Sequence, residues 1–280
     1  MTISRKQIEI TVIFADNGES LTVSDLRMNV ALSLGLNSIH GILQASIEGL
    51  TLDIMQRLTT VGFIQANNRM NNILVKAGND GEELALIHAG TIDRAFIDAT
   101  YQPSPTFNIY SGSALSVALT APPATSYNGS VSIDNVFHDL ARSAGLAFKN
   151  FGVNNVVENP YLTGSTLDKI KILARSYDID FSIDKKILTI WRQDGIKDNK
   201  PLIISPSSMP GALIGYPQYS GDMLELRTLF SPVYDYSTPL LLESHIDIYN
   251  RTWYAKSIIH NLQSQTPNGA WFSDLKCVTG

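Results

Sequence analysis

The sequence predicts a mainly β protein that carries a small inserted α/β module, and three observations support this fold class. Apolar and polar residues alternate in several segments before residue 112 and again after residue 201, which is the pattern of half-buried strands. Between these regions, apolar residues recur at three- and four-residue spacing, as in amphipathic helices. Only 17% of the residues are charged, which favours neutral polar strand faces over long salt-bridged helices.

The region before residue 112 is expected to form closely spaced strands in a sandwich or barrel. Segment 51–60 breaks the alternation and is expected to be a short helix capped by Thr51. Asn79-Asp80-Gly81 is expected to form a hairpin turn, because these residue types tolerate a positive φ. Alternation predicts strands over 7–16, 26–34, 43–48, 73–76, 84–88, 92–97 and 107–110.

Residues 130–192 are expected to form a separate module of two helices and a hairpin. Ser132 caps an amphipathic helix that Gly145 ends, since these residue types are favoured at the two helix termini. A second helix begins at Thr166, and a hairpin follows over 181–191. The module is therefore α/β in character, unlike the regions that flank it.

From residue 201 the alternation returns and predicts a second β region. Asn250-Arg251 is interpreted as the turn of a long hairpin, which places His245 and His260 too far apart to share one metal ion. The sequences at 89–92 and 255–258 are similar, but two four-residue matches leave an internal duplication open. Alternating residues and short apolar runs predict strands over 202–204, 223–229, 240–249, 252–262 and 271–278.

These changes along the chain predict its domain organisation. The first β domain is expected to span residues 1–118, the α/β module 119–198 and the second β domain 199–280. The prediction allows discontinuous domains that exchange strands. Pro122-Pro123, followed by an Asn-Gly turn, marks the first linker.

The composition excludes several classes of protein. A net charge of −5 with no basic run longer than Lys185-Lys186 lacks the electrostatic footprint of a nucleic-acid-binding protein. One cysteine, Cys277, excludes a disulfide framework and a thiolate metal cage. Residues 1–7 carry no secretory signal, and the longest apolar stretch, 28–36, is half a membrane span. We therefore expect a soluble chain that is not exported and does not enter a membrane.

No motif of catalysis or cofactor binding occurs in the sequence. A Gly-x-Ser-x-Gly elbow, a phosphate loop, paired cysteines and a His-Glu-x-x-His motif are all missing. The alternating series from Asp178 to Asp184 lacks the glycine and the final glutamate of a calcium loop, so it is interpreted as a solvated strand face. Five isolated histidines are interpreted as structural: His40, His88, His138, His245 and His260. We expect a non-enzyme with no catalytic residue, no cofactor and no metal.

Aromatic residues concentrate in the last third of the chain. Two interpretations stay open: a β-barrel core with tyrosines at its rim, or an interface in which Tyr and Trp supply binding energy. The residues are Tyr216, Tyr219, Phe230, Tyr234, Tyr236, Tyr249, Trp253, Tyr254, Trp271 and Phe272.

Three stretches resemble the baseplate hub proteins of contractile-tailed bacteriophages, the late control protein D group and the hub region of type VI secretion spikes. Residues 45–60 read ASIEGLTLDIMQRLTT, similar to the family's strand, Gly-Leu and Leu-Thr segment. Residues 72–92 read NILVKAGNDGEELALIHAGTI, similar to its Val-x-Ala-Gly strand, turn and following strand. Residues 225–244 and 252–278 resemble its C-terminal domain, with a Leu-Phe-x-Pro segment and a closing strand that contains Trp271.

The resemblance implies a structural protein of a virion tail baseplate, made in the cytoplasm of the bacterial host. It implies two tail-tube-like β-barrel or sandwich domains that flank the two-helix and hairpin module. Three copies would then form a pseudo-sixfold ring that joins the tail tube to the central spike and leaves a channel for DNA. The implied partners are further copies of the chain, a tail tube or distal tube protein, a central spike protein and baseplate wedge proteins, with DNA passing only transiently.

Two further expectations depend on that ring. An acidic channel wall would let DNA slide without sticking. Ring closure is expected at the strand edges near 26–34 and 240–249, with these contact residues: Leu26, Met28, Val30, Leu32, Leu240, Leu242, Ile246 and Ile248.

Two other functions remain as alternatives. One is a β-rich carbohydrate- or cell-wall-binding module, since residues 164–180 also resemble half of a LysM repeat. The other is a hydrolase whose carboxylates come together only in the folded chain.

Overall fold

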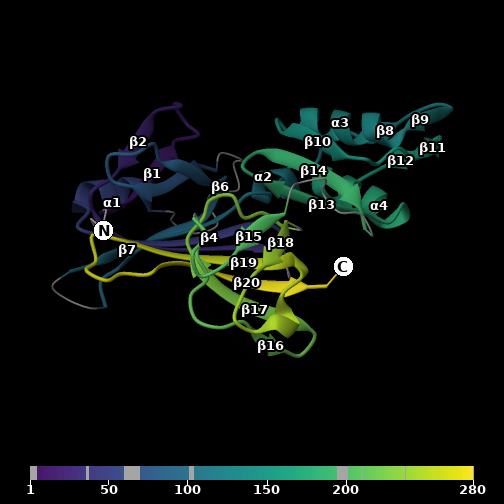
Figure 1. Ribbon diagram of the computed structural model, residues 1–280. Helices are drawn as coiled ribbons and strands as arrows, with labels where there is room; N and C mark the ends of the chain where they lie inside the picture. The colour runs from purple at the N-terminus through teal and green to yellow at the C-terminus, as the bar shows by residue number, and fades with distance from the viewer. Residues whose placement is uncertain are drawn as a thin grey trace.

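Figure 1 shows the computed structural model, which describes residues 5–35, 38–59, 70–100, 104–193, 201–209, 211–236 and 238–279. The first β region contains β1 (Lys6–Ile13), β2 (Ser20–Val23), β3 (Arg27–Gly35), β4 (Ser38–Glu48), α1 (Leu52–Leu58), β5 (Asn72–Asn79), β6 (Ala85–Asp98) and β7 (Thr106–Gly112). The module contains α2 (Leu115–Leu119), β8 (Thr125–Ser126), β9 (Ser130–Ser132), α3 (Ile133–Ser143), β10 (Ala147–Phe151), β11 (Val156–Glu158), β12 (Tyr161–Leu162), α4 (Thr166–Ser176), β13 (Ile179–Asp184) and β14 (Ile187–Arg192). The last region contains β15 (Leu202–Ile204), β16 (Gln218–Ser220), β17 (Met223–Leu229), β18 (Pro239–Leu242), a 3-10 helix (Asp247–Tyr249), β19 (Thr252–Ser264) and β20 (Trp271–Val278).

The two β regions are joined in one large sheet. Its strand order is β16-β17-β20-β19-β3-β4-β7-β6-β5-β1-β2, and several of these strands run side by side across the middle of Figure 1. The first and the last β region meet where β3 pairs antiparallel with β19. The pairing runs from Met28 opposite Ser264 to Gly35 opposite Ser257. The predicted fold class, mainly β with an α/β insert, is confirmed. The boundaries at 118 and 198 stay predictions, and residue 198 lies outside the described part of the chain.

Strict alternation within the strands builds the core of this sheet. Along β3, Met28, Val30 and Leu32 are buried, whereas Arg27 and Asn29, which alternate with them, are exposed. Because successive side chains of a strand point to opposite faces, one face of the sheet is apolar. Burial of each such aliphatic side chain contributes about 1.5–3 kcal/mol. The same hydrophobic cluster includes residues from β1, β5, β17 and β20, so both β regions share one continuous core.

The short helix predicted after β4 is confirmed as α1. Thr51 is its N-cap, and the Thr51 hydroxyl accepts a hydrogen bond from the Ile54 amide at 3.5 Å. Met55 and Leu58 bury one side of the helix in the core shared by the β regions. The helix ends at Leu58, and residue 60 of the predicted segment lies outside the described residues.

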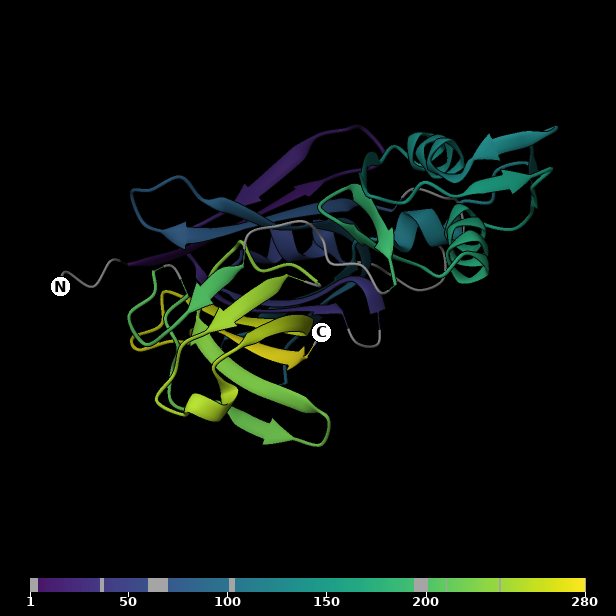
Figure 2. The same ribbon diagram turned by 45° about the vertical axis from the view of Figure 1, so that its right-hand side comes forward.

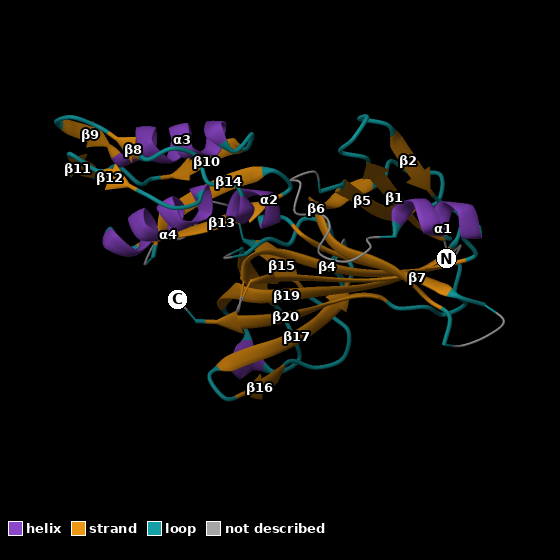
Figure 3. Ribbon diagram, turned by 180° about the vertical axis from the view of Figure 1, so that it is seen from behind, coloured by secondary structure: helices purple, strands orange, loops and turns teal. Residues whose placement is uncertain are grey.

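The module folds around a hydrophobic cluster of its own. β10 and β13 pair with β14, and α3 and α4 pack on this small sheet. Figure 2 shows the module projecting from one side of the large sheet, and Figure 3 shows α3 and α4 together in it, away from α1. α4 begins as predicted, because Ser165 and Asp168 form a reciprocal capping box.

Two strand predictions are wrong in detail. The segments 84–88 and 92–97 form one strand, β6, whose pairing with β7 contains a bulge between Ile92 and Arg94. The segment 240–249 is a strand only as far as Leu242. Beyond it, the Asn250 side-chain oxygen accepts a hydrogen bond from the Ser244 amide at 2.7 Å, which turns the backbone away from β19. The hairpin register therefore pairs Leu240 with Trp253.

The module meets the sheet through a buried hydroxyl. Ser113 accepts a hydrogen bond from the Gly41 amide at 2.8 Å and donates one to the Ile183 carbonyl oxygen at 2.6 Å. β13 also forms a single parallel bridge to β4, at Ile183 opposite His40. These contacts attach the module to the end of β4. Among the described residues, no helix is long and apolar enough to cross a membrane.

Candidate functional site

The large sheet presents one continuous open face across seven strands, which we call the polar face. Its members are exposed or half-buried, and they occupy the strand positions that alternate with the core residues. They are Arg94, Phe96 and Asp98 (β6), Thr106, Asn108 and Tyr110 (β7), Ile42, Gln44, Ser46 and Glu48 (β4), Arg27, Asn29, Ala31 and Ser33 (β3), Ile259, Asn261 and Gln263 (β19), Phe272, Asp274 and Lys276 (β20), and Glu225, Arg227 and Leu229 (β17).

Strand register aligns the polar face into transverse rows. In one row, Asn29 lies between Ser46 of β4 and Gln263 of β19. The next row runs from Arg94 to Phe272 across six strands, and its members are Arg94, Tyr110, Gln44, Ala31, Asn261 and Phe272. At about 4.8 Å between neighbouring strands, six strands span roughly 24 Å. The sheet is therefore wide enough to form one wall of a macromolecular channel or groove.

Charges on the polar face are balanced, mostly as cross-strand pairs. Arg27 lies 3.4 Å from Glu48 and Arg227 lies 2.7 Å from Asp274. The Lys276 ammonium lies 2.8 Å from the Glu225 carboxylate. The Arg227 guanidinium donates a hydrogen bond to Asp274, and this bond raises the pKa of Arg227. With Arg94 and Asp98 added, the face carries four cations and four anions, so it has no excess of either charge.

Five of the predicted contact residues point into the core of the chain itself. Met28, Val30, Leu32, Leu240 and Leu242 are buried, and the strands that carry them have neighbours on both sides. Their side chains are therefore unavailable to a partner, and neither strand is a free edge. The alternation that suggested an interface arises from burial within the chain.

The other three predicted contact residues retain some exposure. Leu26 packs on the core with part of its surface, Ile246 is half-buried, and Ile248 is 70% exposed in the 3-10 helix. Contact with a partner remains a prediction at these three positions. The structure does not bring them together with the buried five into one surface.

The free end of the sheet has exposed aromatic rings. β16 is the last strand of the sheet order. Tyr219 within it is 51% exposed, and Tyr216 just before it is 71% exposed. Tyr219 stacks on Tyr249, with ring centroids 6.3 Å apart. By contrast, Trp253 is buried in the core. The core interpretation is confirmed for Trp253, and the interface interpretation stays a prediction for the exposed tyrosines.

Two of the histidines are buried and paired with serines across strands. His88 lies 2.9 Å from the Ser111 hydroxyl, and His260 lies 2.8 Å from the Ser273 hydroxyl. Burial, together with the charge of Lys185, lowers the pKa of each of these histidines to about 3. Both imidazoles are therefore neutral at physiological pH. Within the described residues, no group of three His, Cys, Asp or Glu side chains is arranged to hold a metal ion.

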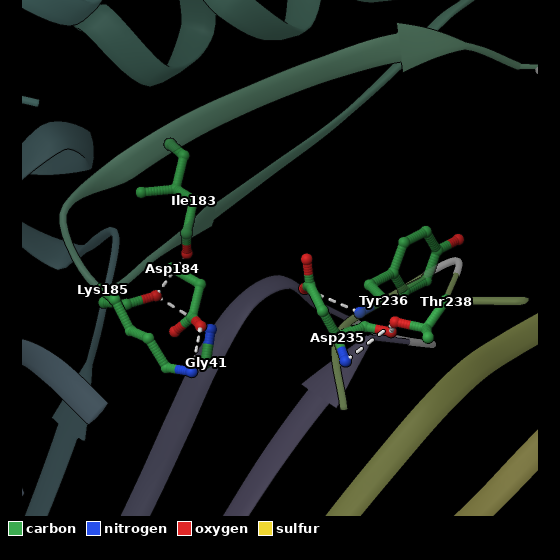
Figure 4. A network of polar contacts seen from close by, with 8 residues as sticks. Gly41, Ile183, Asp184, Lys185, Asp235, Tyr236 and Thr238 are labelled. Carbon is green, nitrogen blue, oxygen red and sulfur yellow. Dashed lines mark hydrogen bonds and ion pairs between the residues drawn. The ribbon is translucent and has the colours of Figure 1, made fainter. Parts of the chain in front are cut away.

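A crevice lies where the module meets the sheet. Its enclosed volume is about 10 Å³, which is about what one water molecule needs and far below the roughly 300–1,000 Å³ of small-molecule sites. Figure 4 shows two polar groups at this junction: Asp184 and Lys185 near Gly41, and Asp235 with Tyr236 and Thr238. Burial, with Lys171 nearby, lowers the pKa of His40, which also lines the crevice. The crevice fits the role of a packing junction better than that of a substrate pocket.

Comparison with solved structures identifies proteins of the same architecture. The 43 kDa tail protein of prophage MuSo2 from Shewanella oneidensis aligns over 97% of this chain and 98% of its own, with a TM-score of 0.63 and 11% identity. A tail protein from Neisseria meningitidis MC58 aligns over 96% of both chains, with a TM-score of 0.65 and 8% identity. The chain has the fold of phage tail proteins.

A type VI secretion protein shares the tail-protein fold. Escherichia coli c3393, described as similar to the T4 tail proteins gp27 and gp5, aligns over 96% of this chain and 76% of its own, with a TM-score of 0.61 and 9% identity. The sequence matches no protein-family model and no curated protein. At these identities the likeness establishes the fold, and it covers both β regions and the module.

Proposed function

We propose that this chain is a structural baseplate hub protein of a phage or phage-like tail. Three copies form a pseudo-sixfold ring that joins the tail tube to the central spike, and the polar face lines the channel. The protein acts in the virion tail, and it contacts tube, spike and wedge proteins. The proposal includes no catalytic step.

The observation that carries this proposal is the single sheet that spans both β regions and leaves one wide face open. The full-length likeness to phage tail proteins and to a type VI secretion protein supports the same function. A tube wall needs such a surface, with strands paired side to side and a hydrophilic face toward the channel. Neutral amides and paired charges would line this channel instead of the acidic wall expected from the sequence.

Native mass spectrometry with negative-stain electron microscopy of the purified protein tests the ring. Three copies of 30.7 kDa give a species of about 92 kDa, which we expect to see end-on as a ring with a central hole. Because some rings close only on a neighbouring protein, the measurement is repeated in the presence of a tail tube protein. A monomer in both measurements that sediments with purified cell wall would support the wall-binding alternative instead.

A further inference from the structure

One cation of the polar face differs from the other three. Arg27, Arg227 and Lys276 each form an ion pair with a carboxylate on a neighbouring strand. Arg94 is exposed and forms no ion pair with any residue that the structure describes. The face therefore holds one guanidinium whose charge is not offset by a direct partner.

Aromatic rings hold this guanidinium in place. The Arg94 guanidinium carbon lies 4.3 Å from the centroid of the Tyr110 ring and 5.8 Å from that of Phe96. The two rings are themselves stacked, with centroids 6.2 Å apart and planes 8° from parallel. Arginine on an aromatic ring loses less conformational freedom when it binds an anion, because the planar group is already positioned.

The surroundings of Arg94 suit a phosphate on a polymer. A guanidinium presents five N–H donors in a fork that matches phosphate geometry, and stacking on a ring leaves the edge of the group free. Gln44 and Asn108 lie on the neighbouring strands of the same face, where they add neutral hydrogen-bonding groups. The carboxylates of Asp93 and Asp98 on the same strand limit the local positive potential, so binding at this position is weak.

We propose that Arg94, supported by Tyr110 and Phe96, is a phosphate-binding position for duplex DNA on an otherwise neutral wall. The site rests on the proposed function in one respect, namely that the polar face lines the channel. In a ring of three copies it supplies three isolated phosphate contacts. Such contacts slow or centre DNA in the channel without binding it tightly.

The test is fluorescence anisotropy of a labelled DNA duplex with the purified full-length protein at low ionic strength. We expect weak binding whose affinity falls with salt, with a slope of about 0.9 for each phosphate contact. Arg94→Gln should lower the affinity about tenfold, as for loss of one hydrogen bond to a charged group, and should flatten the salt slope. Arg94→Lys should retain part of the affinity, because the charge stays and the stacking is lost.

Arg175→Gln on α4 is the matched control, since it changes the net charge equally but lies in the module. Equal binding by Arg94→Gln and Arg175→Gln would overturn the inference, and so would an absence of binding by the unmodified protein. The oligomeric state of each variant is measured in parallel. DNA binding that depends on Arg94 in a protein that never forms rings would support the phosphate site and contradict the hub proposal. A protein that forms rings but does not bind DNA would support the hub proposal and contradict the phosphate site.

Discussion

At the scale of single residues, buried polar groups determine how the parts of this protein are joined. Ser113 carries two hydrogen bonds between the sheet and the module, and His88 and His260 are held neutral beside serines. Lys169 is fully buried in the module, where its ammonium donates to the Pro123 carbonyl oxygen at 2.6 Å. Each group is costly to leave unpaired, so these residues specify one arrangement of the chain.

Replacing Ser113 by alanine should destabilise the junction. The Gly41 amide and the Ile183 carbonyl would lose their buried partner, at a cost of about 1–3 kcal/mol in the free energy of unfolding. Urea denaturation followed by tryptophan fluorescence measures this change, because Trp191 lies in the module. Ser116→Ala on the exposed side of α2 is the control. Equal effects of the two substitutions would show that the Ser113 bridge contributes nothing.

The buried histidines predict a pH dependence of stability. Their pKa of about 3 in the folded chain is below the 6.5 of an unperturbed histidine, so the unfolded chain binds more protons between these pH values. Stability should therefore be full above pH 6.5 and should fall as the pH drops from 6.5 toward 3. His260→Gln should reduce this slope, whereas His245→Gln in an exposed loop should not. A slope that His260→Gln leaves unchanged would contradict the prediction.

At the scale of elements, the pairing of β3 with β19 closes the sheet between the two ends of the sequence. Gly35 lies at the end of this ladder with φ of +84°. A Cβ atom there would come within 2.3 Å of the Lys256 carbonyl oxygen and 2.7 Å of the Tyr236 ring. The glycine is thus required both by its backbone conformation and by the close approach of β19.

Gly35→Ala should destabilise the protein more than Gly18→Ala. Both glycines have a positive φ, but a Cβ at Gly18 would meet no atom within 4 Å. Gly18→Ala should lower the free energy of unfolding by about 1 kcal/mol, because alanine is strained in the left-handed conformation. The steric clash in Gly35→Ala should add about 1–3 kcal/mol to this loss. Chemical denaturation of the two variants measures the difference. Equal costs would mean that β19 withdraws from Gly35 without penalty.

At the scale of the whole molecule, the chain folds around two separate hydrophobic cores. One serves the large sheet and draws on both ends of the sequence, and the other belongs to the module alone. Cys277 lies fully buried in the first core, where burial raises the pKa of its thiol to about 12. Since only a thiolate reacts, labelling of Cys277 reports opening of the sheet.

Ile170→Ala in α4 should destabilise the module without exposing Cys277. Removing this buried side chain should lower the free energy of unfolding of the module by about 2–5 kcal/mol. The rate of Cys277 labelling in native buffer should stay unchanged. Leu275→Ala, which lies in the sheet core two residues from the thiol, should accelerate labelling. Hydrogen exchange of α4 confirms that the module is weakened. Faster labelling in Ile170→Ala would mean that the two cores unfold as one unit.

Most of the elements follow from local patterns, and so does the fold class. The capped helices α1 and α4 and the hairpin of β13 and β14 were predictable, because caps, turns and side-chain periodicity act over a few residues. The strand predicted over 240–249 failed because a side-chain network around Asn250 competes with sheet pairing. The interface prediction failed at Met28 and its buried companions because alternation does not distinguish a core face from a contact face.

The sequence by itself determined where most strands of the two β regions and the helices α1, α3 and α4 lie, that an α/β module interrupts the two β regions, and that the chain resembles phage tail proteins. Only the tertiary structure decided that β3 pairs with β19, that five predicted contact residues are core, and that Arg94 forms no ion pair with a residue in the described part of the chain. The physical reason is the separation along the sequence of the residues that interact. Periodicity and capping are set by neighbours along the chain, whereas strand order depends on residues as far apart as Met28 and Ser264. The ion pairs of the polar face likewise join residues that are 21 to 51 positions apart.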